Sequence, residues 1–533
     1  MKKPRIIGQE VEYALATIPY ALPDTLIRSD AAKCFFDTIR ERVFENSDRL
    51  LSQFLPNGAR LYCDTGGHPE YATPECLGPK QLVCAEQAGD RFLEQIQSQA
   101  NRILKERKPA YQTYQIRLYK NNTDNRGETW GCHENYLIKP RLFSELTSPL
   151  DKNELRNIFI SYLISSIIYT GSGDVVKLSN NSLAFHVSQR AKSITRIFSN
   201  STTSNRPLIN SRDEAHAKTE EWRRLHLIAR DSNMSPLAVY LKFGTASIIL
   251  EMLETNPRLF GRNMVLRDPI ESLRYISGDS KLKAVSVCSD YLEYTALEFQ
   301  KMFCETAARY VEQNGSKEDK EVVSRWQEVL DALSRYATEP ELLVGKIDWI
   351  TKKYLISEKI RKICKYFEGD VFLDPFFDYC GKRVEIKPNQ FVSPADLAMA
   401  MHYQYHDIRQ DKGLFYLVSK NDETLVSKED VDSMIDDAPK GARAELRGFL
   451  VKEFKQYGEI YDMTFNWNYC CLQDNLMKIE QLSDVEKYAN RFLNLTFEFP
   501  NPYERRLPPG YDEVLKFHKI IDEIPEQFRP AAK

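Results

Sequence analysis

The chain lacks the short motifs that identify many enzymes at once. Its 533 residues contain no GxxxxGK[S/T] loop, so a bound nucleotide would have to be held by side chains. The 11 cysteines are scattered and form no CxxC pair, which disfavours a disulfide framework or a zinc ribbon and indicates reduced thiols. The eight histidines form no HExxH motif, so the sequence offers no support for a zinc enzyme.

Long apolar runs and an excess of one charge are also missing. The most apolar stretch, residues 158–169, is shorter than the roughly 20 residues that span a bilayer. The 73 basic and 76 acidic residues leave a net charge of −3, which implies no general attraction to nucleic acid or to an anionic membrane. The first 13 residues contain no apolar segment of a secretion signal. We therefore expect a cytoplasmic protein that binds neither nucleic acid nor membrane.

Length and pattern indicate a large α+β protein. Strands with one polar face alternate with amphipathic helices such as residues 82–105, which favours a curved antiparallel sheet backed by helices. Trp326 lies on an apolar helical stripe that is typical of a core. The turn-rich stretch at 436–441, DDAPKG, is the best candidate for a boundary. We expect one large domain over residues 1–435 and a small C-terminal domain over residues 436–533.

The stretch with the most unusual composition reads NGARLYCDTGGHPEYATPE. Arg60, Tyr62 and Asp64 stand at alternate positions of its first half, so as a strand they point to one face. Beyond the Gly-Gly turn, His68 and Glu70 share a face of a second extended run. Burying such groups unpaired costs several kcal/mol each, so this face is a poor core. A solvated hairpin and a functional site both remain open for this stretch alone.

A second acidic strand at residues 5–14 favours the functional interpretation. Glu10 and Glu12 are two residues apart and lie on one face, where like charges repel unless a cation stands between them. Magnesium prefers hard oxygen ligands, keeps several waters and bridges to phosphate. Two acidic strands with Arg60 beside one of them therefore predict a metal–nucleotide site.

Five segments extend this prediction to a family. They read GQEVEY, NGARLYCDTGGHPEYATPE, LYKNNTDNRGETWGCHENYL, INSRDEAHA and RRLHLIARDSNMS. In this order and wording the chain resembles the Pup ligase and Pup deamidase (depupylase) family, a group of carboxylate–amine ligases with a glutamine-synthetase-like core. The resemblance runs from the first strand to Trp467. It implies a glutamine-synthetase-like α+β fold, ATP and Mg²⁺ as cofactors, and Pup and lysine-bearing proteins as partners.

The resemblance also assigns roles to single residues. The positions that match the family's magnesium ligands are Glu10, Tyr62 and Glu70. The positions that match its ATP contacts are Arg60, Thr73 and Trp467, and Asp64 matches its catalytic aspartate. These assignments agree with the chemistry, since an arginine binds phosphate as a fork, a tryptophan stacks on adenine and carboxylates hold the metal.

Other polar residues near these motifs are further candidates for the site. For Glu12, direct metal binding and a supporting ion pair both remain open. Arg212, Arg224 and His226 are candidates for contacts with phosphate or with the tail of the modifier. We interpret His68 and His133 as ordinary hydrogen-bonded histidines.

The function expected from the resemblance is ATP-dependent formation of an isopeptide bond. The enzyme would phosphorylate the C-terminal glutamate of a Pup or Pup-like modifier and join it to protein lysines, marking them for the proteasome. The alternatives are a depupylase, a small-molecule glutamate–amine ligase and a non-catalytic modifier-binding relative. The span from Gly8 to Asn57 is too short for the long insertion typical of the depupylase, which favours the ligase. Residues 368–397 are longer than the family pattern, which leaves a Pup-like protein open as the modifier in place of Pup itself.

Overall fold

The structure is a computed structural model. It describes residues 4–18, 25–43, 52–64, 66–107, 112–124, 127–148, 153–178, 182–201, 204–363, 369–372, 384–387, 390–419, 425–455, 461–474, 494–507 and 511.

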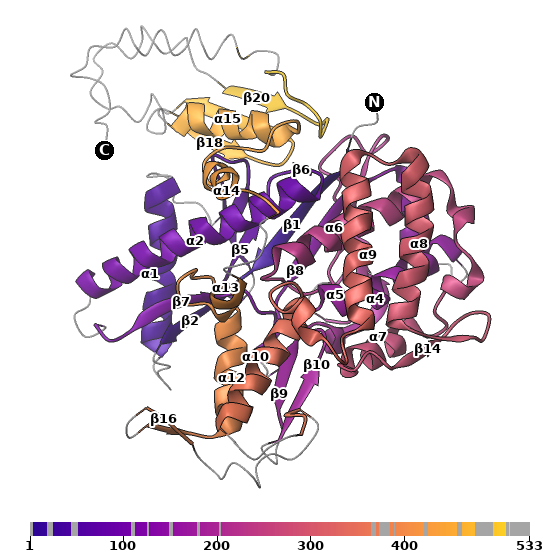
Figure 1. Ribbon diagram of the computed structural model, residues 1–533. Helices are drawn as coiled ribbons and strands as arrows, with labels where there is room; N and C mark the ends of the chain where they lie inside the picture. The colour runs from indigo at the N-terminus through magenta and orange to yellow at the C-terminus, as the bar shows by residue number, and fades with distance from the viewer. Residues whose placement is uncertain are drawn as a thin grey trace, which may run out of the picture.

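A nine-stranded sheet forms the centre of the described chain, in the order β11-β12-β13-β8-β1-β5-β4-β3 with β6 beside the start of β1 (Figure 1). Its strands are β1 (Ile6–Glu12), β3 (Ser52–Phe54), β4 (Arg60–Asp64), β5 (His68–Ala72), β6 (Cys76–Leu77), β8 (Cys132–Ile138), β11 (Ile194–Ser199), β12 (Arg206–Asn210) and β13 (Arg223–Leu227). All neighbours pair antiparallel except β11 and β12, which are parallel. The predicted antiparallel sheet is therefore confirmed, with one parallel pair at its edge.

Helices cover one face of this sheet and leave the other face to polar side chains. Val11, Leu61 and Tyr71 are buried in one core cluster with apolar residues of the long helix α2 (Pro79–Arg107). The side chains that alternate with them on β1, β4 and β5 point to the opposite face. The predicted N-terminal strand is interrupted at Tyr13, between β1 and β2 (Ala14–Ile18). The side chain of Tyr13 is fully buried on the face that the helices cover.

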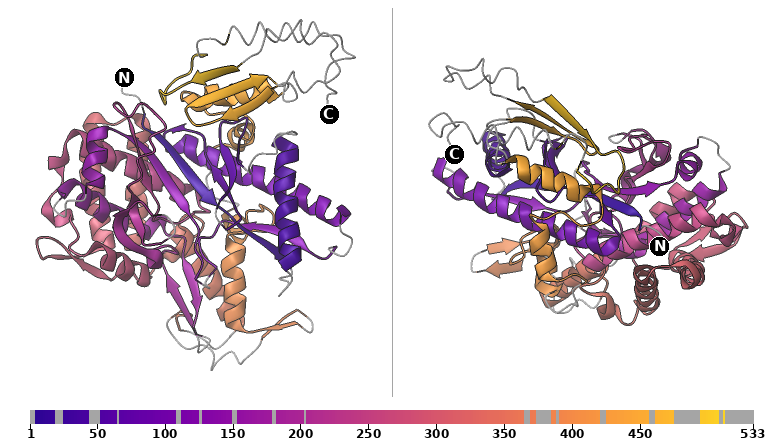
Figure 2. Two further views of the ribbon diagram at one scale, coloured as in Figure 1. Left: turned by 180° about the vertical axis from the view of Figure 1, so that it is seen from behind. Right: turned by 90° about the horizontal axis from the view of Figure 1, so that it is seen from above.

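The remaining helices build the body of the protein around the sheet (Figures 1 and 2). They are α1 (Thr25–Val43), α3 (Pro140–Thr147), α4 (Glu154–Ser165), α5 (Ile167–Thr170), α6 (Pro236–Thr255), α7 (Pro269–Gly278), α8 (Ala296–Asn314), α9 (Lys317–Ser334), α10 (Asp348–Ile363), α12 (Pro394–Tyr405), α13 (Leu414–Ser419), α14 (Lys428–Met434) and α15 (Arg443–Lys455). Trp326 on α9 is fully buried and packs edge-on against Tyr162 and Tyr169, as the apolar stripe predicts.

Helix α6 is the one described helix that is long and apolar enough to cross a membrane. Of its most apolar window, 78% is buried inside the protein. Its serine N-cap, Ser235, accepts a hydrogen bond from the amide of Ala238, which fixes the start of the helix.

Four two-stranded sheets lie outside the central sheet in the described residues. They pair β2 with β7 (Gln115–Tyr119), β9 (Asp174–Lys177) with β10 (Leu183–His186), β14 (Val285–Val287) with β15 (Glu293–Thr295), and β16 (Val384–Lys387) with β17 (Gln390–Val392). The last hairpin belongs to the segment 368–397, of which residues 368, 373–383 and 388–389 lie outside the described residues.

A C-terminal unit lies across one end of the central sheet, beside β6 (Figure 1). It consists of α15 and a three-stranded sheet of β18 (Tyr461–Phe465), β19 (Tyr469–Asp474) and β20 (Asn494–Glu498). It begins directly after the predicted boundary at 436–441. Helix α15 packs so closely that a β-carbon on Gly58 would lie 2.8 Å from the carbonyl oxygen of Ala444. The division into domains at residue 436 stays a prediction.

Candidate active site

The polar face of the sheet collects the predicted site residues in rows across neighbouring strands. Glu12 on β1 stands opposite Glu70 on β5, and Glu70 stands opposite Tyr62 on β4. Directly opposed residues of antiparallel strands point to the same face with β-carbons about 5 Å apart. The three side chains therefore form one row, and the hydroxyl of Tyr62 hydrogen-bonds to Glu70.

Three carboxylates meet at one end of this row. Oxygens of Glu12, Asp64 and Glu70 lie within 4.8 Å of one another. Burial and the neighbouring carboxylates of Glu10 and Glu12 raise the pKa of Glu70 well above its usual value. Oxygen Oε1 of Glu70 is buried and, among the described residues, has no hydrogen-bond partner. Such a group of hard oxygen donors fits a divalent cation such as magnesium, which would relieve the repulsion.

A second cluster adjoins the first and contains Glu10, His133 and His226, again with ligand atoms within 4.8 Å of one another. Nδ1 of His133 lies 3.1 Å from Glu10 and 4.0 Å from Glu70, so this ring stands between the two clusters. Asn135 donates to Glu10 at 3.0 Å. Burial alone would raise the pKa of Glu10, but its hydrogen bond with His133 and the charges around it hold that pKa well below its usual range.

His226 and Arg224 complete this second cluster. Burial and the charge of Arg224 lower the pKa of His226 well below its usual value, so the imidazole is neutral, which is the form that binds a metal. Arg224 lies 3.5 Å from Glu10 and 3.1 Å from Glu214. The hydrogen-bonding role expected of His133 is present, and its place beside Glu10 adds a metal-binding capacity that the sequence did not suggest.

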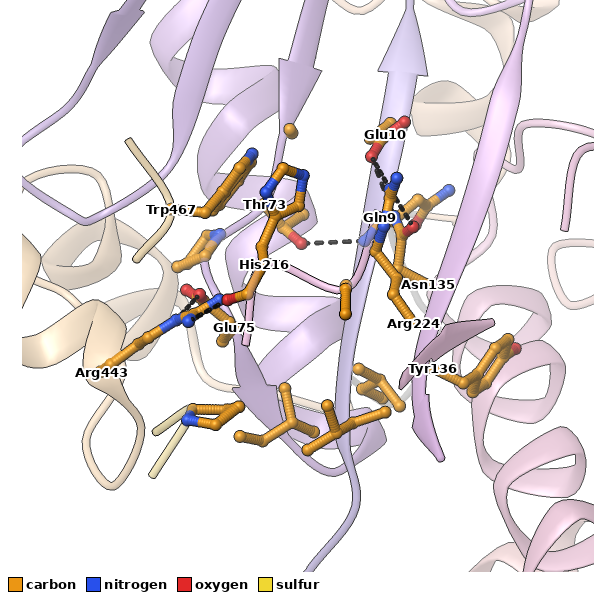
Figure 3. Close-up of a pocket in the computed structure, with 18 residues that line it drawn as sticks. Gln9, Glu10, Thr73, Glu75, Asn135, Tyr136, His216, Arg224, Arg443 and Trp467 are labelled. Atoms are coloured by element: carbon orange, nitrogen blue, oxygen red, sulfur yellow. Dashed lines mark hydrogen bonds and ion pairs between the residues drawn. The ribbon is translucent and has the colours of Figure 1, made fainter. Parts of the chain in front are cut away.

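Beside these two clusters, a pocket opens between the central sheet and the C-terminal unit. Thr73 and Trp467 both line it, as do Glu10 and Arg224 (Figure 3). The hydroxyl of Thr73 accepts a hydrogen bond from the amide of Gln9, which ties the end of β5 to β1. Apolar residues and the charged side chains of Glu10 and Arg224 together line the pocket, a combination that suits a base and a phosphate chain.

Two predicted contacts lie apart from this pocket. Arg60 donates to the hydroxyl of Ser52 at 2.8 and 3.0 Å, and its guanidinium lies 4.9 Å from the ring centre of Tyr62. Among the described residues, Arg60 forms no ion pair with Asp64. Arg212 is exposed, and its Nε donates to the carbonyl of Asn200.

The pocket also contains residues that reasoning from the sequence did not select, namely Glu75, His216 and Arg443. Glu75 ends one of the motifs noted above and His216 lies within another, but nothing in their spacing shows that they meet. Arg443 comes from α15, more than 200 residues beyond His216, so only the tertiary structure brings it to the site.

Comparison with known proteins shows the family to which the chain belongs. Residues 5–366 and 376–471 match the family model described as Pup-ligase protein. The chain belongs to the Pup-ligase family. The unmatched break at 367–375 falls at the start of the segment 368–397, which the sequence predicts to be longer than the family pattern.

Relatives of this Pup-ligase family member cover nearly its whole length. It is 37% identical over 483 residues to the Pup–protein ligase of Acidimicrobium ferrooxidans, covering 90% of this chain and 95% of that protein. It is 33% identical over 488 residues to the Pup–protein ligase of Kineococcus radiotolerans, covering 91% and 96%.

Two solved structures of the Pup ligase PafA are also similar. The complex of PafA with the prokaryotic ubiquitin-like protein Pup superposes with a TM-score of 0.75 at 27% identity, covering 97% of this chain and 92% of that one. PafA in complex with ADP superposes with a TM-score of 0.69 at 27% identity, covering 94% and 95%. The fold expected from the sequence resemblance is therefore confirmed.

Proposed function

We propose that this protein is an ATP-dependent ligase that joins the C-terminal glutamate of Pup to lysines of substrate proteins. The observation that carries the proposal is the placement of two clusters of potential metal ligands beside a pocket that Thr73 and Trp467 line. The relatives that the chain matches over most of their length are Pup–protein ligases. The matched PafA structures contain Pup in one case and ADP in the other.

The reaction needs two steps because a carboxylate does not react with an amine directly. An oxygen of the glutamate side chain attacks the terminal phosphorus of ATP, and ADP leaves with the electrons of the broken P–O bond. The lysine amine then attacks the carbonyl carbon of the acyl phosphate, and phosphate leaves as the isopeptide bond forms. Free lysine has a pKa of about 10.4, so the amine must lose a proton before or during this attack.

Asp64 is the residue we assign as the base for that proton. It ends β4, is half-buried and pairs in register with His68 across the hairpin. A carboxylate in this position reaches the open face of the sheet, where an incoming amine would meet the acyl phosphate. In the structure Asp64 also lies beside Glu12 and Glu70, so its carboxylate helps to set the charge of the first cluster.

Magnesium is the cation that we assign to the two clusters. Glu10, Tyr62 and Glu70, the positions that match the family's magnesium ligands, would hold the ion, with Glu12 beside Glu70. Bound magnesium would neutralise the phosphate charge that develops during transfer. Arg224 lines the pocket and lies close to Glu10, so its guanidinium would also contact the phosphate chain.

Trp467 and Thr73 would hold the nucleotide, and the C-terminal unit of residues 436–533 would complete its site. Arg60 is assigned a phosphate contact only through the family resemblance, because in the structure it lies over Tyr62 instead of in the pocket. We further propose that the protein works in the cytoplasm, where ATP and proteins with free lysines are available.

The deciding experiment mixes the protein with ATP, magnesium, a Pup that ends in glutamate and a lysine-bearing target. Conjugate that appears on a gel only with ATP supports the ligase. Omitting ATP and replacing the terminal glutamate by alanine are the controls. Release of free target from a conjugate made beforehand, without formation of new conjugate, would show a depupylase and overturn the proposal.

A further inference from the structure

A buried carboxylate links the central sheet to the C-terminal unit at the wall of the nucleotide pocket. Glu75 lies between β5 and β6, and its side chain is 11% exposed. It binds two arginines of α15. Arg443 donates to it from Nε at 2.7 Å, and Arg447 donates from both terminal nitrogens, one of them at 3.2 Å. Arg447 is fully buried and Arg443 nearly so.

Each of these arginines reaches onward to an aromatic residue of the pocket. Arg447 donates to the carbonyl of Trp467 at 3.0 Å, and its guanidinium lies 4.8 Å from the centre of the indole. Arg443 donates to the carbonyl of His216. Figure 3 shows the imidazole of His216 and the indole of Trp467 directed into the same cavity, with Glu75 and Arg443 below them.

His216 is held in a conformation that needs such support. Its φ is +48°, in the left-handed region that side chains with a β-carbon rarely adopt. Burial and the charges of Arg224 and Arg443 lower the pKa of its imidazole to about 4, so the ring is neutral at physiological pH. A neutral imidazole presents a flat surface against which a base can pack.

We infer that Glu75 is a positioning residue of the nucleotide pocket, which through Arg443 and Arg447 sets the rings of His216 and Trp467. The inference rests on the proposed function, in which this pocket holds the adenine of ATP. Without a carboxylate at residue 75, two buried guanidinium groups would face each other with no counter-charge, which is strongly unfavourable. Movement of either arginine would release the carbonyl that it holds and with it one wall of the pocket.

Glu445 supplies the matched control. It lies on the same helix α15 and also binds an arginine, since Arg505 donates to it at 2.8 Å. That pair is far more exposed, with side chains 32% and 56% exposed, and neither partner lines the pocket. Glu445→Gln therefore removes an ion pair of the same type from the same helix without touching the pocket.

The test compares Glu75→Gln and Glu445→Gln with the unmodified full-length protein. ADP affinity is measured by calorimetry without Pup, and KM for ATP, KM for Pup and kcat are measured in the conjugation assay. For Glu75→Gln we expect the Kd for ADP and the KM for ATP to rise about tenfold or more, as for removal of one partner of a buried ion pair. The KM for Pup and kcat at saturating ATP should change less than about twofold, because the lost interaction acts on nucleotide binding.

A lower melting temperature with unchanged ADP affinity would overturn the inference, as would an equal effect of Glu445→Gln. If Glu75→Gln does not fold, Arg447→Lys replaces it, because lysine keeps the charge but loses the forked contacts with Glu75 and Trp467. Unchanged ADP affinity in that variant would overturn the inference equally. If the unmodified protein binds ADP but forms no conjugate, the proposed function fails, whereas the role of Glu75 in nucleotide binding is still tested.

Discussion

Glu12 accepts a hydrogen bond at 2.6 Å from the backbone amide of Gly131, the residue just before β8. A β-carbon on residue 131 would lie 2.4 Å from the same carboxylate oxygen and 2.4 Å from Nε2 of His133. Both neighbours belong to the acidic clusters that we assign to magnesium. The glycine therefore sets the distance between a carboxylate of one cluster and the histidine of the other.

Gly131→Ala should therefore lower turnover without unfolding the protein. The φ of Gly131 is not in the left-handed region, so alanine fits the backbone and only the contacts with Glu12 and His133 must shift. A displacement of about 1 Å at a reacting centre costs roughly 10²-fold in rate. The control is Gly278→Ala, since a β-carbon there meets no atom within 4 Å. Conjugation rate and melting temperature are measured for both, and normal turnover of Gly131→Ala would refute the assignment.

Glu10→Gln and Glu70→Gln should abolish conjugation and raise the magnesium concentration needed for ATP binding. Each change removes an anionic oxygen ligand while keeping the size of the side chain. Glu312→Gln is the control, because its side chain is 78% exposed and distant in the sequence from both clusters. The measurement is activity against magnesium concentration. Wild-type activity of both variants at saturating magnesium would exclude these residues as ligands.

Trp467→Ala should weaken ATP binding by about 1–3 kcal/mol if the indole stacks on adenine, taking base stacking in nucleic-acid complexes as the analogue. Trp467 also packs edge-on against Phe54, with ring centres 5.0 Å apart, so the change lowers stability as well. Trp467→Phe keeps an aromatic surface and should retain most of the affinity. A variant that melts early but binds ATP normally would show that the tryptophan is only a packing residue.

Asp64→Asn separates the proposed base from a purely structural role. Loss of the proton acceptor should slow transfer to lysine by roughly 10²–10⁴-fold. Raising the pH should restore part of the rate, because more of the lysine arrives already neutral. Since Asp64 adjoins Glu12 and Glu70, magnesium and ATP affinities are measured alongside the pH–rate profile. Lost ATP binding with no recovery at alkaline pH would overturn the assignment.

The acid stability of the protein should depend on Glu75. Burial raises its pKa, but the charges of Arg447 and Arg443 outweigh burial and lower that pKa from 4.5 to about 2. A carboxylate with a lowered pKa in the folded state stabilises the fold above its unfolded pKa and loses this effect as pH falls toward its folded pKa. A shift of this size corresponds to about 3 kcal/mol, lost between about pH 4.5 and pH 2.

The measurement is the difference in melting temperature between the unmodified protein and Glu75→Gln. It should be constant between pH 6 and pH 8 and should shrink as pH falls below about 4.5. A difference that stays constant in acid, or that grows, would contradict the pairing of Glu75 with the two arginines.

Local sequence determined the strands of the site and the side of the sheet to which each residue points. The alternation in residues 60–64 and 68–72 fixed which side chains share a face, because a strand has a period of two and cannot rotate one residue alone. The same rule placed the side chains of Glu10 and Glu12 on one face of the sheet and that of Val11 on the other face, where it is buried against α2. The residues of the five motifs were enough to indicate the family, because the chemistry of a site depends on which side chains are present.

Only the tertiary structure decided which strands are neighbours and which distant segments close the pocket. The row of Tyr62, Glu70 and Glu12 depends on β5 lying between β4 and β1, a pairing that no periodicity specifies. Glu75 meets Arg447 across 372 residues of chain, and His216 meets Arg443 across 227. Such contacts depend on how the core packs as a whole, because burying two guanidinium groups is favourable only where folding brings a carboxylate to meet them.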